Sequence, residues 1–350
     1  GNFFVGDSFV QSFGPVSNNN PDLKWEENRE FNLGLDITAF DNRMQATIEY
    51  YERITDDLLF EVEVPVPPNL FPTTWRNVGR MDNTGLDLSL GYDIIRNQNT
   101  NWNSLVNFST FETILVEFVD ETRFVANAGS PGQNAVNFVR LREGEELGQL
   151  WAPVFAGVDD QGRELVFDAE GNRVTTDQVT QDDGAVVGKG LPDFEIGWTN
   201  TLNYKNWDVS IFLRGVFGHD LINTQKVFFE HPSNITNWNV TESALDIKNI
   251  TSAPSFTSRQ VEDADFVRFQ NFTVGYTIPL GNEGLLSDVR RVRLYVSGNN
   301  LFSITNYTGI DPEVRYEDTG TGAGSLAPGI ERRDQWFTAR SISVGVNLDF

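Results

Sequence analysis

The sequence predicts an all-β fold, an antiparallel transmembrane β-barrel with about nine strands in this chain. Many segments alternate apolar and polar residues with a period of two, as strands do when one face meets an apolar environment. The connections between these segments are alternately short and long, which is typical of membrane barrels with short periplasmic turns and long extracellular loops. No apolar run approaches the ~18 residues of a membrane helix, so strands rather than helices carry the apolar surface.

Composition excludes several other classes of protein. The 350 residues include 26 Lys and Arg against 50 Asp and Glu, which gives a net charge of −24. Such a surface repels nucleic acid, so no nucleic-acid partner is expected. Cysteine is absent, which rules out disulfides and thiolate metal sites. His219 and His231 are the only histidines, so neither a catalytic triad nor a histidine zinc site is expected.

Four strands are expected in the first third of the chain. The first two flank a short "FDNR" turn, and both have apolar residues at alternate positions. The fourth follows the pattern less cleanly, with apolar residues at Trp102, Val106 and Phe108. Each segment is close to the ~9–11 residues with which a tilted strand crosses a membrane. The expected ranges are 31–40, 43–52, 85–95 and 102–111.

Five further strands are expected after a long connection. In the first of them one face carries Phe194, Ile196, Trp198, Leu202 and Tyr204. The last strand ends the chain as "SISVGVNLDF", in which apolar and polar residues alternate without a break. The expected ranges are 193–204, 207–217, 266–278, 290–299 and 337–350.

The connections have two lengths, and each predicts a side of the membrane. We expect the short connections to be periplasmic turns, because aromatic residues of an interfacial girdle lie beside them, namely Tyr92, Trp102, Tyr204, Trp207 and Tyr276. The long connections hold most of the proline, glycine and acidic residues. We expect them to be extracellular loops, at 52–84, 112–192, 218–265 and 300–336.

Several stretches resemble the SusC/RagA-like TonB-dependent outer-membrane transporters. "NPDLKWEENREFNLGLD" (20–36) is similar to a loop and strand entry of that family. "NVGRMDNTGLDLSL" (77–90) is close to its NVGxMxNxGxE/D pattern, in Asn77, Val78, Gly79, Met81, Asn83, Gly85 and Asp87. The stretches 188–223, 265–279 and 291–314 resemble later strands and loops of the family in the same order.

This resemblance implies much that the residues alone do not. It implies that the chain is the C-terminal part of a ~22-stranded barrel filled by a plug, in the outer membrane of a Gram-negative bacterium. It also implies a SusD-like surface lipoprotein as a lid, and energy from TonB–ExbB–ExbD. The family's plug domain and TonB box are not found in this sequence. Filling the barrel and coupling it to TonB are therefore expected to need an N-terminal part. The terminal Phe350 is similar to the family's C-terminal assembly signal, and is expected to close the barrel against the first strand.

Ligand contacts are expected in the long loops rather than in the strands. Aromatic rings that lie there can stack on sugar rings or on apolar side chains, and their alternative role is loop packing. The candidates are Trp75, Trp151, Trp238 and Trp336.

One loop has part of the pattern of a calcium site. "FDAEGNRVTTD" (167–177) places Asp168 and Glu170 before Gly171, but a calcium loop also needs a third oxygen ligand before the glycine. We therefore expect a plain hairpin turn, and no metal or cofactor.

Nutrient import of oligosaccharides or peptides through the outer membrane is the function that these features predict. The first alternative is a surface glycan-binding β-sandwich without transport activity, whose apolar faces would meet a second sheet. The second is a secreted glycoside hydrolase, since 50 acidic residues contain carboxylate pairs by chance. Enzymatic activity is not expected, because no G-x-S-x-G elbow occurs and the two histidines are far apart in the sequence.

Overall fold

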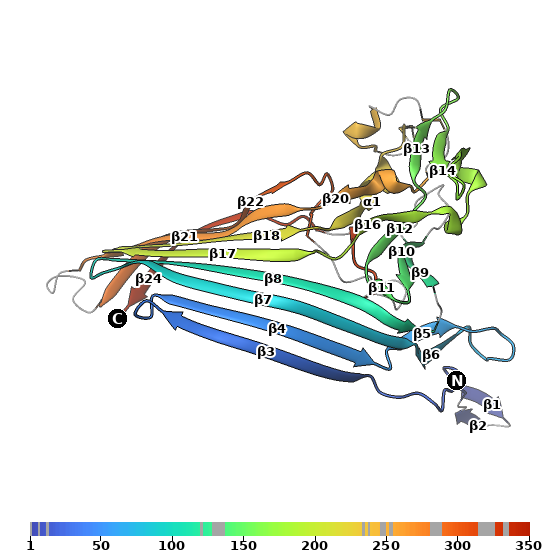
Figure 1. The fold of residues 1–350 in the computed structure, drawn as a ribbon, viewed down its shortest axis with the longest axis horizontal. Coiled ribbons are helices and arrows are strands. Elements are labelled where there is room, and N and C mark those ends of the chain that lie inside the picture. Colours follow the sequence, from blue (N-terminus) through green and yellow to red (C-terminus); the bar gives the residue numbers. More distant parts are fainter. Residues whose placement is uncertain are drawn as a thin grey trace.

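Nine long strands of a computed structural model form one continuous antiparallel sheet (Figure 1). The structure describes residues 2–5, 8–11, 14–119, 122–127, 137–232, 235–236, 239–245, 250–251, 255–280, 289–313, 326–331 and 336–350. Each strand of the sheet is hydrogen-bonded to the one before it in the chain's order of long strands. They are β3 (Glu27–Ala39), β4 (Met44–Asp56), β7 (Gly79–Arg96), β8 (Thr100–Phe118), β17 (Phe194–Tyr204), β18 (Trp207–Phe217), β21 (Phe266–Ile278), β22 (Arg291–Thr305) and β24 (Ser341–Asp349). The predicted all-β antiparallel fold class is confirmed.

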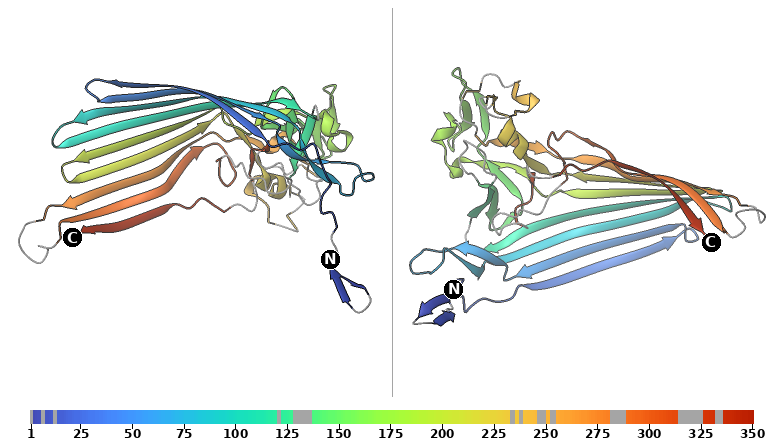
Figure 2. Two further views of the ribbon diagram at one scale, coloured as in Figure 1. Left: turned by 90° about the horizontal axis from the view of Figure 1, so that it is seen from below. Right: turned by 180° about the vertical axis from the view of Figure 1, so that it is seen from behind.

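The sheet is a single layer (Figure 2). Its two faces differ chemically, because apolar and polar residues alternate along the strands. On the apolar face Leu33, Ile342 and Val344 are 63%, 65% and 79% exposed. Since no second sheet covers this face in the described part of the chain, the β-sandwich alternative does not fit the fold. None of the described helices is long and apolar enough to span a membrane.

Several strands extend further into the long connections than the alternation predicted. We expected a loop to begin at residue 52 and the next strand at 85, but β4 continues to Asp56 and β7 begins at Gly79. Likewise, β8 continues to Phe118 and β22 to Thr305. The apolar period stops where the lipid-facing rows would end, whereas backbone pairing goes on between charged side chains such as Arg53 and Glu30.

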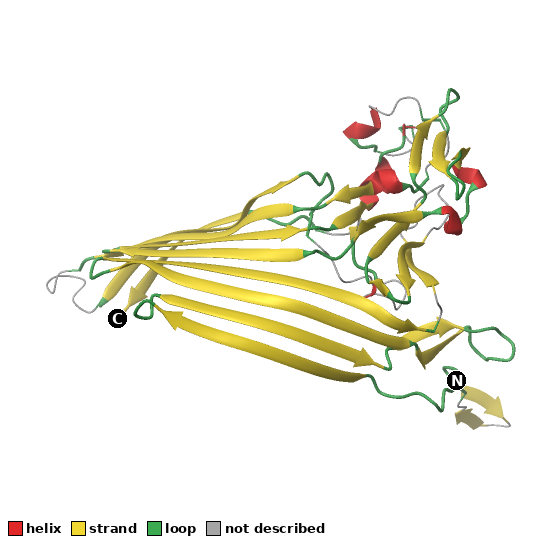
Figure 3. Ribbon diagram, in the orientation of Figure 1, coloured by secondary structure: helices red, strands yellow, loops and turns green. Residues whose placement is uncertain are grey.

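The long connections fold into small sheets and short helices, which we did not predict (Figure 3). Their strands have two to six residues, too few to establish a period of two. One four-stranded sheet consists of β9 (Thr122–Asn127), β10 (Asn137–Arg142), β12 (Gln149–Ala152) and β16 (Ala185–Lys189). Smaller sheets contain β13 (Phe155–Val158), β14 (Glu164–Phe167) and β15 (Arg173–Thr175); β19 (Asp220–Asn223), β20 (Val261–Asp263) and β23 (Ile330–Glu331); and β5 (Leu59–Glu63) and β6 (Thr73–Asn77). A separate hairpin, β1 (Asn2–Val5) and β2 (Ser8–Gln11), precedes the first long strand.

The remaining elements are short and also lie in the connections. The two-residue strand β11 (Glu145–Glu146) pairs with β8, and α1 (Thr224–Phe229) is capped by the side chain of Asn223. Single 3-10 turns lie at Thr176–Gln178, Gln181–Asp183, Glu242–Leu245 and Ser258–Gln260.

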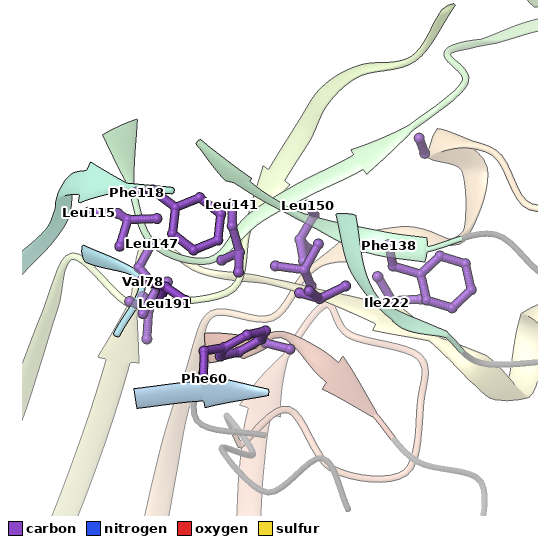
Figure 4. Close-up of a cluster of buried hydrophobic side chains, with 14 of the residues drawn as sticks. Phe60, Val78, Leu115, Phe118, Phe138, Leu141, Leu147, Leu150, Leu191 and Ile222 are labelled. Carbon is purple, nitrogen blue, oxygen red and sulfur yellow. The ribbon is translucent and has the colours of Figure 1, made fainter. Parts of the chain in front are cut away.

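Among the described residues, the larger of two buried hydrophobic clusters lies within these connections and at the adjoining ends of long strands (Figure 4). Leu150 of β12 and Ile222 of β19 are fully buried there, and Phe60 of β5 is 4% exposed. The cluster also takes in Leu115 and Phe118 from the C-terminal end of β8. A core of this kind fixes the connections to the end of the sheet.

Two residues of the NVGxM stretch show why that pattern suits this place. Asn77 donates from Nδ2 to the carbonyl oxygens of Lys24 and Asp57, so it ties the segment before β3 to the end of β6. Gly79 has a φ of 158°, and a Cβ there would overlap the carbonyl oxygen of Glu117. The pattern therefore holds β7 at the point where it enters the sheet.

Candidate functional site

The polar face of the sheet carries a shallow cavity of about 380 Å³. Its walls come from five neighbouring strands, and the cross-strand register places Thr47, Ser89, Asn107 and Arg214 in nearly one row. Three carboxylates, Glu49, Asp87 and Glu195, also line it. The charged groups of the cavity are therefore mainly acidic, and apolar residues such as Phe212 also line it.

An ion-pair network lies at the end of this polar face that is nearest the long connections. Arg214 of β18 and Arg268 of β21 are directly opposite each other on paired strands, an arrangement of like charges that is unfavourable by itself. Glu313 bridges them, since its two carboxylate oxygens accept from Arg214 Nη1 at 2.6 Å and from Arg268 Nη1 at 2.8 Å. Glu195 lies 3.1 Å from Arg214 and completes that end of the network.

The segment that carries Glu313 is held by a second carboxylate. Asp311, 3% exposed, accepts from Arg268 Nη2 at 2.5 Å and from the hydroxyl of Thr338. Burial opposes the charged form of Asp311, yet the hydrogen bonds from Thr338 and Arg268 hold its pKa below the usual value. The network therefore joins β18, β21 and the residues before β24 through residues 311–313.

For a third carboxylate, Glu331 of β23, the pKa shifts in the opposite direction to that of Asp311. It is 1% exposed and accepts from the backbone N–H groups of Ile310 and Asp311. Burial outweighs these bonds and raises the pKa of Glu331. Sequence reasoning missed all three carboxylates. The available signal for Asp311 and Glu313 was "GIDPEV", quoted for the family resemblance but not as a site, and Glu331 lies outside that stretch.

Trp151 is packed among loop side chains. Its ring lies under the Arg140 guanidinium at 4.5 Å and 5.6 Å from the ring of Phe124. Its Nε1 donates to the carbonyl oxygen of Gln181 at 2.8 Å. These contacts engage the indole within the chain.

The other predicted tryptophans are not gathered around Trp151. Trp75 lies on β6 and is 48% exposed, whereas Trp336 precedes β24 and is 92% exposed. Trp238 lies outside the described residues. No ring contact joins any two of the three tryptophans that the structure describes. An equally exposed indole at Trp25, 88% exposed, was not among the predicted candidates.

The 167–177 segment forms a hairpin between β14 and β15. Asp168 accepts from the backbone N–H groups of Glu170 and Asn172 and from Asn172 Nδ2. These bonds, with that of the Asn172 side chain foremost, lower the pKa of Asp168. Its carboxylate is thus engaged within its own turn, and no group of three metal-ligating side chains occurs in the described part of the chain.

The family of the chain follows from comparison with known proteins. Residues 2–301 match the family model described as TonB dependent receptor-like, beta-barrel. The chain belongs to the TonB-dependent receptor family. The resemblance to SusC/RagA-like proteins is thereby confirmed, and relatives support it along the whole chain.

Two relatives and one solved structure show how far the similarity extends. TonB-dependent receptor P3 of Formosa agariphila is 31% identical over 99% of this chain, which covers 36% of that protein. SusC of Bacteroides thetaiotaomicron is 26% identical over 89% of the chain and 32% of its own length. The structure of the RagAB peptide transporter matches with a TM-score of 0.77 and 25% identity, over 100% of this chain and 38% of the other. The chain thus spans about a third of each of these TonB-dependent receptors and transporters.

Proposed function

We propose that the chain forms part of the wall and outer loops of a SusC-like importer of oligosaccharides or peptides. The observation that carries this proposal is the single-layer sheet with one apolar and one polar face, which matches the RagAB peptide transporter over the whole chain. A sheet of this kind suits lipid on one side and a wet lumen on the other. The named relatives are receptors and transporters, and the proposal includes no enzymatic step.

The proposed orientation follows from the lengths of the connections. Short turns such as Lys205–Asn206 face the periplasm, and the loop sheets face the outside, as in other membrane barrels. The protein crosses the outer membrane of a Gram-negative bacterium many times in this arrangement. The strand β24 and Phe350, 73% exposed, then lie where a further strand can close the barrel.

The proposed partners lie on both sides of the membrane. A SusD-like lipoprotein covers the loop sheets from outside, and TonB–ExbB–ExbD supplies energy through a part of the protein beyond this chain. Trp75 and Trp336 offer exposed rings for substrate on the outer side. Trp151 and Trp238 remain candidates of the same kind.

Uptake by living cells tests the proposal. Cells of the producing bacterium that lack the gene should fail to accumulate fluorescently labelled peptides or oligosaccharides above the size limit of porins, and the gene in trans should restore uptake. A protonophore should abolish the restored uptake, because import depends on TonB. Uptake that is unchanged in the deletion strain would contradict the proposal.

A further inference from the structure

The apolar face of the sheet is interrupted by two polar residues that lie side by side. The fourth expected strand broke its alternation at Ser104, and the fifth at Asn200. The register places Ser104 of β8 directly opposite Asn200 of β17. Both irregularities in the sequence therefore form one feature of the surface.

Two tryptophans of the same face are hydrogen-bonded to this pair. Trp198 donates from Nε1 to Ser104 Oγ at 2.9 Å, and Trp102 donates from Nε1 to Asn200 Oδ1 at 3.2 Å. Trp198 is 45% exposed and Trp102 36%. We call Trp102, Ser104, Trp198 and Asn200 the polar window, because apolar residues such as Leu90, Val106 and Ile211 surround it on the same face.

The two indole N–H groups donate to the oxygen atoms of Ser104 and Asn200, but the amide N–H groups of Asn200 have no acceptor among the described residues. Asn200 Oδ1 receives the Trp102 N–H, whereas no described residue accepts a hydrogen bond from Asn200 Nδ2. A membrane supplies no water to such a group, so its N–H bonds need an acceptor from outside the chain. The window contains no charged side chain, which suits a neutral acceptor better than a phosphate.

The position of the window along the strands identifies the acceptor. Asn200 lies five residues before the Lys205–Asn206 turn. At ~3.3 Å per residue and a tilt near 40°, this places Asn200 roughly 12 Å above the turns. Trp102 belongs to the window, and Tyr204 and Trp207 lie between it and the turn, so the window lies at the level of the aromatic girdle, where hydrocarbon gives way to the ester groups of lipids.

We propose that the polar window binds the glycerol ester of a phospholipid in the periplasmic leaflet. Asn200 Nδ2 donates to an ester carbonyl oxygen, and the rings of Trp102 and Trp198 flank the acyl chain. A lipid ester offers acceptors without donors, which matches the excess donors of Asn200. A protein segment would bring N–H groups of its own that the surrounding apolar rows cannot satisfy. The inference rests on the orientation given under the proposed function.

Lipid retention by the purified protein tests this inference. The full-length protein, with its partners, is delipidated and incubated with phosphatidylethanolamine carrying either ester-linked or ether-linked chains. Native mass spectrometry then counts bound lipid. We expect the protein to retain one diester lipid per chain and to retain the diether lipid at least about fivefold less, because an ether lacks the carbonyl oxygen. Equal retention of both lipids would overturn the proposal without any variant.

Two matched variants locate the site. Asn200→Leu removes the amide donors and should abolish the preference for the ester lipid. Asn203→Leu changes the same residue type on the same strand, but on the polar face, and should retain lipid as the parent does. An unchanged preference in Asn200→Leu would also overturn the proposal. Since the assay requires no transport, a failure of the uptake experiment leaves its result interpretable.

Discussion

At the scale of the residue, Glu313 is the carboxylate that pairs with both arginines of the network. Arg214 and Arg268 face each other across paired strands, and Glu313 lies between them. Glu313→Gln removes the shared charge and leaves the guanidinium groups opposed. Because Glu313 is partly exposed, we expect a loss of about 1–3 kcal/mol rather than the larger cost of a fully buried pair.

The measurement is the midpoint temperature of thermal unfolding. It is determined from the heat-modifiable migration of the assembled protein on gels. Glu112→Gln is the control, because Glu112 is exposed at the outer end of β8 and its carboxylate has no ion pair in the described part of the chain. Its midpoint should stay close to that of the parent. Equal shifts in both variants would show that Glu313 has no special role.

Asp311 should give the network a dependence on pH. Its folded-state pKa is lowered, so its charge contributes stability above the unfolded-state pKa of about 3.9, and that contribution disappears as the pH falls through the folded-state value. Asp311→Asn should therefore unfold at a lower temperature than the parent at pH 7. The difference should shrink as the pH falls below about 4.

The charge of Glu331, in the same region, affects stability in the opposite direction to that of Asp311. Its folded-state pKa is raised, so its charge opposes folding above that pKa, and acidification through the raised value relieves the penalty. As the pH falls, protonation of Glu331 should therefore stabilise the parent protein, whereas protonation of Asp311 should destabilise it. A gap between Asp311→Asn and the parent that stays constant from pH 7 to pH 3 would contradict the assignment.

At the scale of the element, alternate residues of each strand face opposite sides of the sheet, one apolar and one polar. Ile211 and Val344 lie on the apolar face, whereas their neighbours Ser210 and Ser343 lie on the polar face. Arginine at Ile211 or Val344 should impair assembly, because a lipid-exposed Arg near the bilayer midplane costs about 2–4 kcal/mol. Arginine at Ser210 or Ser343 should be tolerated. An assembly assay that finds equal defects at both parities would disprove the assignment of the faces.

The long strands could be predicted from the sequence because a period of two is a local property. The residues of "SISVGVNLDF" already establish which side chains share a face, whatever strand lies beside them. The ion-pair network could not be found in this way. Arg214, Arg268 and Glu313 are separated by 45 to 99 residues, and only the register brings them together. The loop sheets escaped prediction for a similar reason, since strands such as β12 are too short to show a period.

At the scale of the whole molecule, the sheet has two edges that need cover. β3 and β24 each pair on one side only in the described part of the chain. Unpaired backbone groups cost several kcal/mol each in a membrane, so we expect further strands to lie along both edges. Produced alone, the 39.4 kDa chain should not give a folded, heat-modifiable species in detergent, whereas a longer product that supplies those strands should. A folded, partnerless monomer of this mass would contradict the expectation.

The buried cluster among the outer connections has an immunological consequence. Residues distant in the sequence, such as Phe60, Phe138 and Ile222, pack in this cluster and hold those connections in one fixed arrangement at the end of the sheet (Figure 4). In the orientation proposed above, antibodies or phages that approach the cell meet a discontinuous epitope composed of several connections at once. Linear peptides copied from any single connection would then raise sera that bind the boiled protein on a blot and ignore intact cells.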